Sequence, residues 1–441
     1  MLLDTTILNI ALPAIGRDLG GGTGDLQWVV TAYRIAFGSL LLSGGALSDR
    51  LGTLRVYTWG LAGFGVASLL CAVAPVLGLL IAGRALQGVA AAVMVPSSLS
   101  LIAHTFPEPR ERARAVGIWI GSSGIAACAG PLVGGILIDA LDWRAVFVVN
   151  VPVVVAGVLV TRRVVPAVPR GPGRALDLTG QLLAVVVLVA LSAGFIESGE
   201  HPWGSPWVWV PLAVGLATAV MFVLVERRHH DPVMPIALFR GARFSAANGI
   251  GALVNLGFYG QLFVLSLYFQ EVLGLTPLEA GLAFLPLFGS TFVVSWAAGR
   301  MTGRTGPARP MAIGLAVGLV GFLLLLPAGE GTSYWQLVPG LLLVSMGAFV
   351  PAPLSVAVIA SAPDEQSGVV SGVLNAMRQT GGAIGVAILG SLVASGAFVD
   401  GMHRALLVSS ASYVIALALT LAYLRERPRP SPRSAPAGAP A

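Results

Sequence analysis

Residues 45–52 read GALSDRLG, and residues 299–306 read GRMTGRTG. Both stretches begin with a glycine, carry a large apolar residue and then an arginine at the same spacing, and end with a glycine. Each is a short basic segment between two long apolar runs. Weak internal repetition of this kind is typical of membrane proteins built from duplicated helical bundles. The repeat therefore predicts two related halves.

The composition extends this prediction to the whole chain. Of the 441 residues, 56% are hydrophobic and only 10% are charged, whereas a soluble domain carries about 25% charged residues. The mean hydropathy is +0.85. A soluble core of this size could not hide so much apolar surface, so lipid must surround most of the chain. We expect an all-α polytopic membrane protein.

The apolar runs set the number of spans. A helix needs about 20 apolar residues to cross the hydrocarbon. Cutting the chain at charges and at Pro/Gly breaks predicts fourteen spans. They are 1–15, 28–47, 56–74, 76–102, 115–137, 146–160, 178–196, 207–225, 244–268, 280–298, 311–327, 335–359, 368–393 and 405–424. We expect six-helix bundles in 1–161 and 229–425, two extra helices in 162–228, and a disordered cytoplasmic tail in 426–441.

The arginines predict the orientation. All 26 basic residues are Arg, and most of them fall in loops that are cytoplasmic if the N-terminus is cytoplasmic. The opposite loops hold Arg17, Arg144 and Arg404 alone. This bias follows the positive-inside rule and places both termini in the cytoplasm. It also explains the net charge of +6 without nucleic-acid binding.

The first span is short and contains an acid. Residues 1–15 are too few to cross comfortably, so either the helix is short or the true start lies upstream, and we favour an upstream start. As given, the sequence would place Asp4 at the cytoplasmic mouth. It is the one acid inside the predicted spans. An intramembrane acid is a functional hypothesis by default.

Three arginines, Arg34, Arg84 and Arg378, lie inside predicted spans. A guanidinium within the bilayer must find a carboxylate, carbonyls or water. Arg84 and Gln87 are three residues apart, on one helical face, and Asp4 is the leading partner for Arg84. Two interpretations stay open: Arg84 binds loop carbonyls, or it tunes the proton affinity of a nearby carboxyl group.

The segment GALSDRLG predicts a gate. Gly45 would let two helix ends approach closely, and Asp49 could accept from helix amides or pair with an arginine. With Arg50 and Gly52, this would form a latch that opens and closes. The alternative is that the arginines enforce topology alone.

The fifth predicted span contains GSSGIAACAGPLVGG, residues 121–135. Small residues on one face allow tight helix packing, and a proline removes a backbone donor and kinks a helix. We expect this helix to limit leakage between the two halves. Its candidate residues are Gly121, Gly130, Pro131, Gly134 and Gly135.

The thirteenth predicted span holds polar residues at mid-length. A deep Arg378 is unfavourable unless it faces a cavity, so a substrate path and helix–helix contact are both open. The candidate substrate cavity comprises Arg34, Gln87, Asn375, Arg378 and Gln379.

Other function classes find little support. The chain contains no Lys, which excludes a P-loop ATPase. The histidines lie at loops or span ends, and His229–His230 beside Asp231 indicate a solvated loop more than a metal site. Cys71 and Cys128 lie in apolar runs as packing residues. We therefore expect no enzyme activity, no metal and no cofactor.

Several motifs resemble the major facilitator superfamily, and within it the fourteen-span drug:proton antiporters of the EmrB/QacA type. These are LDTTILNIALP near the start, GALSDRLG, RALQGVAAA, GPLVGG and WRAVFVVNVP. The resemblance implies that Asp4 is a proton or cation site, that Arg84 assists proton coupling, and that Asp49 and Arg50 form the gating latch. It also implies that Gly130 and Pro131 mark export.

The sequence departs from that family in three places. A basic cluster usually follows Gly52, but here the chain reads Thr53-Leu54-Arg55. Many relatives have an apolar residue at the position of Arg34. Spans seven to fourteen contain no interior acid, which argues against dication substrates and for neutral, zwitterionic or monovalent lipophilic ones.

We therefore expect a proton-coupled exporter of lipophilic drugs or metabolites, working by alternating access. It would be a monomer in a bacterial cell membrane, with the proton gradient as its energy source. The alternative is a proton-coupled symporter for uptake of a small organic solute, against which the GPLVGG motif speaks.

Overall fold

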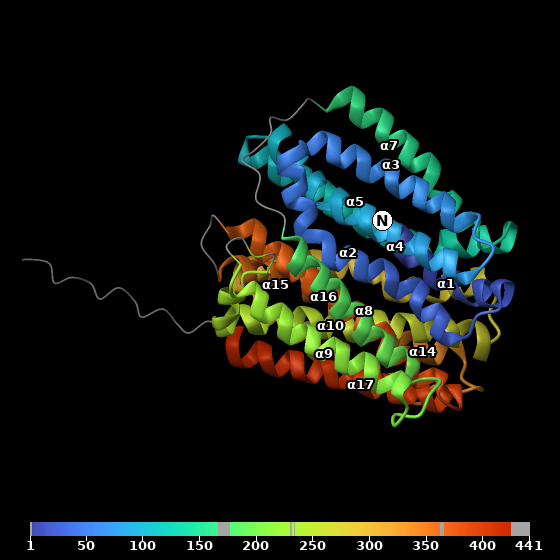
Figure 1. Cartoon of the computed structure of the whole chain (residues 1–441). Helices are drawn as coiled ribbons and strands as arrows, with labels where there is room; N and C mark the ends of the chain where they lie inside the picture. The colour runs from blue at the N-terminus through green and yellow to red at the C-terminus, as the bar shows by residue number, and fades with distance from the viewer. Residues whose placement is uncertain (1, 166–176, 230–231, 233, 362–365, 425–441) are drawn as a thin grey trace, which may run out of the picture.

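The computed structural model describes residues 2–165, 177–229, 232, 234–361 and 366–424. Every regular element in these ranges is a helix (Figure 1). The first half comprises α1 (Leu2–Leu19), α2 (Thr23–Leu51), α3 (Thr53–Ala72), α4 (Leu77–Thr105), α5 (Pro109–Ala140), α6 (Ala145–Val148) and α7 (Asn150–Val164). Two further helices follow, α8 (Leu178–Glu197) and α9 (Pro206–Glu226).

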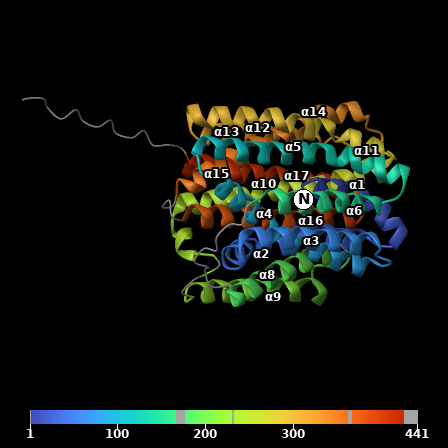
Figure 2. The ribbon, with the colours of Figure 1, turned by 90° about the horizontal axis from the view of Figure 1, so that it is seen from above.

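The second half contains more interrupted helices. Its elements are η1 (Ile236–Arg240), α10 (Ala242–Leu267), η2 (Tyr268–Val272), α11 (Pro277–Ala283), α12 (Leu285–Thr305), α13 (Ala308–Leu324), α14 (Tyr334–Val344), η3 (Ser345–Phe349), α15 (Pro351–Ile359), α16 (Ser367–Ala394), α17 (Phe398–Leu419) and η5 (Thr420–Leu424). The long helices run side by side in one bundle (Figures 1 and 2).

Helices fall on every predicted span, and the fold class is confirmed as an all-helical membrane bundle. In the described part of the chain, ten helices are long and apolar enough to cross a membrane, or eleven if α11 and α12, bent by 44°, form one span. The helix α13 is apolar but shorter. The count of fourteen spans therefore stays a prediction.

Each half has its own helix contacts. In the first half, α2 and α3 pack on α4, and α1 packs on α5. In the second half, α10 packs on α16 and α17, and α13 packs on α14 and α17. A Cβ atom added to Gly260 of α10 would lie 2.6 Å from the carbonyl oxygen of Gly385 in α16. Such backbone approach needs small residues at the contact.

Several helix pairs join the two halves. Helix α2 packs along α16, α1 touches α10, and α5 packs on α11 and α12. We refer to the end of the bundle at the α1–α2 connection as the Gly20 end, and to the end at the α2–α3 connection as the Gly52 end. Both glycines adopt positive φ angles, 72° and 99°, which suit a chain reversal without a Cβ atom.

The helices α8 and α9 lie beside this bundle. They pack on each other, and α8 also packs on α2 and α16, at the outer edge of the contact between halves (Figure 2). The Asp177 side chain caps α8 by accepting from the Gly180 amide at 2.8 Å. Exposed His229 lies 3.8 Å from Asp177 Oδ1. His230, Asp231 and the predicted tail 426–441 lie outside the described residues.

Candidate functional site

The buried ion pair of the first half joins Asp4 of α1 to Arg84 of α4. The Arg84 Nη1 atom donates to Asp4 Oδ2 at 2.7 Å. The two side chains are 2% and 1% exposed, so water screens this pair very little. The partnership is the one that the sequence favoured, since no other acid lies inside a predicted span.

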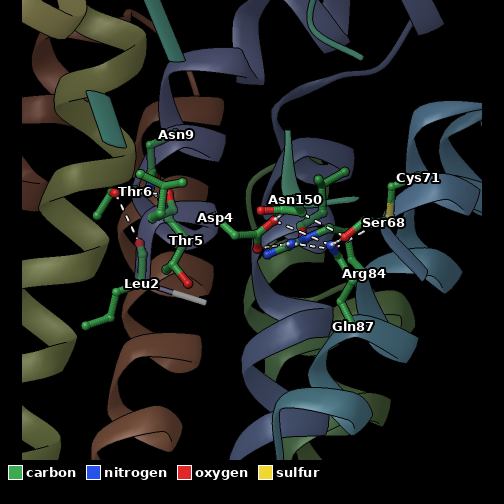
Figure 3. A network of polar contacts seen from close by, with 12 residues as sticks. Leu2, Asp4, Thr5, Thr6, Asn9, Ser68, Cys71, Arg84, Gln87 and Asn150 are labelled. Atoms are coloured by element: carbon green, nitrogen blue, oxygen red, sulfur yellow. Dashed lines mark hydrogen bonds and ion pairs between the residues drawn. The ribbon is translucent and has the colours of Figure 1, made fainter. Parts of the chain in front are cut away.

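Neutral polar side chains surround the pair (Figure 3). Asn150 Nδ2 donates to Asp4 Oδ1 at 2.9 Å, and Gln87 Nε2 reaches the same oxygen at 3.4 Å. Gln87 Oε1 accepts from Arg84 Nη1 at 2.6 Å, and Gln87 Nε2 donates to Ser68 Oγ at 2.7 Å. Both carboxylate oxygens of Asp4 therefore accept hydrogen bonds from buried donors.

The guanidinium of Arg84 has further contacts. Its Nε atom donates to the Val29 carbonyl oxygen of α2 at 3.2 Å. Its carbon lies 4.5 Å from the centre of the Tyr33 ring, within range of a cation–π interaction. The site thus draws on α1, α2, α3, α4 and α7. Adding a proton to Asp4 would remove the charge on which this network is centred, so the network can couple protonation to helix contacts.

Asp4 does not lie at the mouth where the sequence placed it. Its partners Arg84 and Asn150 lie near the starts of α4 and α7, and Ser68 lies near the end of α3, all toward the Gly20 end. The reason is geometric. Helix α1 has 18 residues and α2 has 29, so at 1.5 Å per residue α1 does not reach the Gly52 end. The first turn of α1, which carries Asp4, therefore lies beside the middle part of the neighbouring helices and not at their ends.

The predicted gating segment is helical almost to its end. Helix α2 continues through Asp49 and Arg50 to Leu51, and Gly52 ends it. Both charged side chains are exposed, and neither forms an ion pair among the described residues. The structure therefore holds no closed latch between Asp49 and a described arginine.

The close approach of helices occurs one residue earlier than predicted. A Cβ atom on Gly45 would lie an ordinary 3.9 Å from Pro96. One on Gly44 would overlap the carbonyl oxygen of Ala92 in α4. Successive residues point about 100° apart around a helix, so the prediction chose the right turn of α2 and the wrong face.

The glycines of α5 behave differently along its length. A Cβ atom on Gly130 would overlap the Thr6 side chain, and one on Gly134 would lie 3.3 Å from the Ile7 carbonyl oxygen. One on Gly135 would lie 2.6 Å from the Leu278 Cα of α11. The Pro131 carbonyl likewise lies against Gly281 of α11. This part of α5, toward the Gly20 end, packs as tightly as the small residues indicated.

Nearer the Gly52 end, α5 is not packed in this way. Gly117, Gly121 and Gly124 have open space where a Cβ atom would be, with nothing within 4 Å. The prediction of tight packing was therefore wrong at Gly121. Helix α5 itself continues through Pro131 without interruption, from Pro109 to Ala140.

A second group of predicted residues lies between the halves. Arg34 of α2 is 2% exposed, and its Nη1 atom donates to Gln379 Oε1 of α16 at 3.3 Å. Its guanidinium carbon lies 3.6 Å from the centre of the Tyr259 ring of α10. Arg378 is half-buried, whereas Asn375 is exposed and donates to the Ser371 carbonyl oxygen of its own helix. Gln87 belongs to the Asp4 network instead.

Sequence reasoning missed several partners. Asn150 stood in the quoted segment WRAVFVVNVP but was not assigned to the acid, although an amide between valines is a usable signal. Ser68 and Tyr259 gave no such signal, since serine and tyrosine are common within apolar helices. Their roles follow from the helix packing alone.

An exposed ion cluster lies at the Gly20 end. Trp143 Nε1 and Arg144 Nη1 both donate to Asp18 Oδ2, at 2.9 and 2.8 Å. The hydrogen bond from Trp143, followed by that from Arg144, lowers the pKa of Asp18 below 3.8. The cluster ties the end of α1, beyond the predicted span 1–15, to the start of α6.

Comparison with known proteins agrees with this architecture. The profile described as Major Facilitator Superfamily matches residues 1–386. Over 394 residues the chain is 36% identical to the "Methylenomycin A resistance protein" of Streptomyces coelicolor, covering 89% of this chain and 83% of that protein. It is 35% identical over 396 residues to the "Multidrug resistance protein Stp" of Mycobacterium tuberculosis, covering 90% and 74%.

Solved structures share the fold. One is a POT family transporter in complex with 5-aminolevulinic acid, which aligns with a TM-score of 0.70 over 96% of this chain and 94% of that one. The sequence identity is 15%, so this likeness concerns the arrangement of helices.

Proposed function

This chain belongs to the Major Facilitator Superfamily, and we propose that it exports lipophilic small molecules in exchange for protons. Membership makes it a multi-pass membrane transporter of small molecules rather than an enzyme, and its named relatives confer antibiotic and drug resistance. Efflux is the activity that these relatives support. The coupling to protons is our proposal, together with the fourteen-span EmrB/QacA subtype and a location in the bacterial cell membrane.

The observation that carries the proposal is the buried Asp4–Arg84 pair with its donors. A proton on Asp4 would remove the carboxylate charge and leave Arg84 as a buried cation without a charged partner, which is strongly unfavourable. The network would then rearrange. A group whose proton affinity depends on conformation can take up a proton on one side of the membrane and release it on the other.

The uneven packing of α5 supports alternating access. Toward the Gly20 end, α5 packs closely on α11 at Gly135. Toward the Gly52 end, Gly121 and Gly124 face open space. With the arginine-rich loops in the cytoplasm, this would be an inward-open state. Rocking of the two halves would open the Gly20 end, where a proton from outside reaches Asp4 while the substrate leaves.

Substrate-evoked proton movement in inverted membrane vesicles tests the proposal. Vesicles containing the unmodified chain would be energised, and lipophilic drugs would be added while the internal pH is followed with a fluorescent dye. We expect drug addition to dissipate the pH gradient. Asp4→Asn preserves the shape of the side chain but carries no titratable proton, so it should abolish this response.

The matched control is Asp400→Asn, because Asp400 is an exposed carboxylate at the start of α17. It should couple like the unmodified chain. Coupling by Asp4→Asn at the unmodified rate would refute the proton role of Asp4. No response to any drug, with correctly inserted protein, would refute the proposed exchange itself.

A further inference from the structure

Of the three arginines inside the predicted spans, only Arg84 has a carboxylate partner among the described residues. Asp4 is matched by Arg84, as shown above. Arg34 and Arg378 also lie in helices at the contact between the halves, and neither forms an ion pair with any described carboxylate. A charge within a membrane span is unfavourable by about 2.5 kcal/mol or more. A buried cation that is kept without a counter-ion therefore points to an anion that arrives from elsewhere.

The guanidinium of Arg34 is held in a fixed orientation. The Tyr259 ring stacks on it at 3.6 Å, and Gln379 binds its Nη1 atom. On the other side of the group, the Nε atom is buried and has no hydrogen-bond partner among the described residues. Gly382 of α16 permits this position, since a Cβ atom there would lie 2.7 Å from Nη1. The Nε–H group on one edge of the planar Arg34 guanidinium thus has no acceptor among the described residues.

Arg378 lies one helical turn before Gly382 on α16, so it shares the face that meets Arg34. Its stem packs against α10, where a Cβ atom on Gly251 would lie 3.3 Å from Arg378 Cγ. Its guanidinium makes no hydrogen bond to a described residue. Tyr259 is an electrostatic neighbour of both arginines. Both arginines therefore lie where α10 and α16 meet, with Arg34 reaching this contact from α2.

We propose that Arg34 and Arg378 bind the anionic group of the transported substrate, so that lipophilic carboxylic acids and acidic phenols are the preferred class. The planar guanidinium fork matches a carboxylate with two parallel hydrogen bonds. The apolar helices around it would accommodate the rest of the molecule. This inference rests on the proposed function, because it names the substrate class of the same transporter.

A matched pair of probes tests the charge preference. A naphthalene carboxylate and its primary amide have nearly the same size, and only the first is an anion at pH 7.5. Their binding to the purified full chain in detergent would be measured by probe fluorescence, and their accumulation in inverted vesicles would be measured alongside. We expect the acid to bind at least tenfold more tightly than the amide.

The arginine variants locate the effect. Arg34→Gln should weaken binding of the acid tenfold or more and leave binding of the amide unchanged, and Arg378→Gln should act in the same direction. Arg34→Lys keeps the charge but loses the fork, so it should retain part of the preference. Equal affinity of the unmodified chain for acid and amide would overturn the inference, whether or not the variants fold.

The two proposals fail in different ways. If neutral drugs evoke proton movement and the acid does not bind, the exporter stands and the anionic substrate class is wrong. If the acid binds through Arg34 but no probe or drug evokes proton movement, the binding site stands and the proton exchange is wrong.

Discussion

The Asp4 network and the Arg34–Arg378 region are both buried and charged, but they differ in completeness. In the first, the carboxylate and guanidinium meet at 2.7 Å and neutral partners occupy the remaining oxygen. In the second, a buried guanidinium has a ring and one amide oxygen but no carboxylate. The first region lies within one half, and the second lies where two halves meet. A complete network suits a group that switches by protonation, whereas an incomplete one suits a group that waits for a ligand.

The largest expected effect is on stability, and it separates the two regions directly. Arg84→Gln leaves the Asp4 carboxylate buried without a cation, which should destabilise the fold by about 3–5 kcal/mol. Arg34→Gln leaves no carboxylate behind and removes one hydrogen bond to an amide and the contact with the Tyr259 ring, so it should lose only about 1–2 kcal/mol. Thermal unfolding of each variant in detergent measures both effects. It is monitored as the loss of the monodisperse peak of the folded protein in size-exclusion chromatography.

The double variant Asp4→Asn/Arg84→Gln is the internal control. Because both charges are removed together, it should be more stable than Arg84→Gln alone, with a coupling energy of about 0.5–3 kcal/mol. Equal losses for Arg34→Gln and Arg84→Gln would show that the two regions are not different in kind.

A smaller effect is expected when the neutral partners are removed. Asn150→Ala leaves Asp4 Oδ1 with the 3.4 Å contact from Gln87 alone, which should be unfavourable by about 1–3 kcal/mol. It should also shift the pH dependence of drug-evoked proton movement toward higher pH, because the charged carboxylate loses a donor. The same assay on Gln379→Ala should show no such shift. A shift in Gln379→Ala, or none in Asn150→Ala, would contradict the division of roles.

The smallest effect on stability is expected for the exposed cluster at the Gly20 end. This cluster lies outside both buried regions and serves as a reference for them. Asp18→Asn removes a carboxylate whose pKa Trp143 and Arg144 hold below 3.8. A lowered pKa stabilises the fold above the unfolded-state value and loses that contribution as the pH falls through the folded-state value. Solvent screens this exposed cluster, so the melting temperatures of variant and parent should differ slightly at pH 7 and converge as the pH falls through the folded-state pKa of Asp18. A difference that grew on acidification would contradict this sign.

The apolar helices and the Asp4–Arg84 pairing could both be predicted from the sequence, because the membrane restricts the choice of residues in each case. Lipid imposes hydropathy on long segments, and a single intramembrane acid leaves little choice of partner for a buried arginine. The sequence could not predict properties that depend on rotation and depth. The choice of Gly45 over Gly44 missed by one residue of helical rotation, and the depth of Asp4 depended on how far α1 extends from the Gly20 end.

The neutral partners show another limit. Asn150, Ser68 and Tyr259 lie on three different helices, and an apolar run with one polar residue has many possible neighbours. Only the packing of α7, α3 and α10 selects them. The open space beside Gly121 is of the same kind, because a small residue permits a close contact but does not require one.

The Arg34 guanidinium, buried without a carboxylate partner among the described residues, has an electrical consequence. If one proton enters and one monovalent acid leaves in each cycle, both movements carry positive charge inward, and each is driven by about 2.3 kcal/mol per 100 mV of membrane voltage. A neutral substrate would draw on the voltage through the proton alone. The steady-state accumulation ratio of the acid should therefore depend on voltage about twice as steeply as that of its amide.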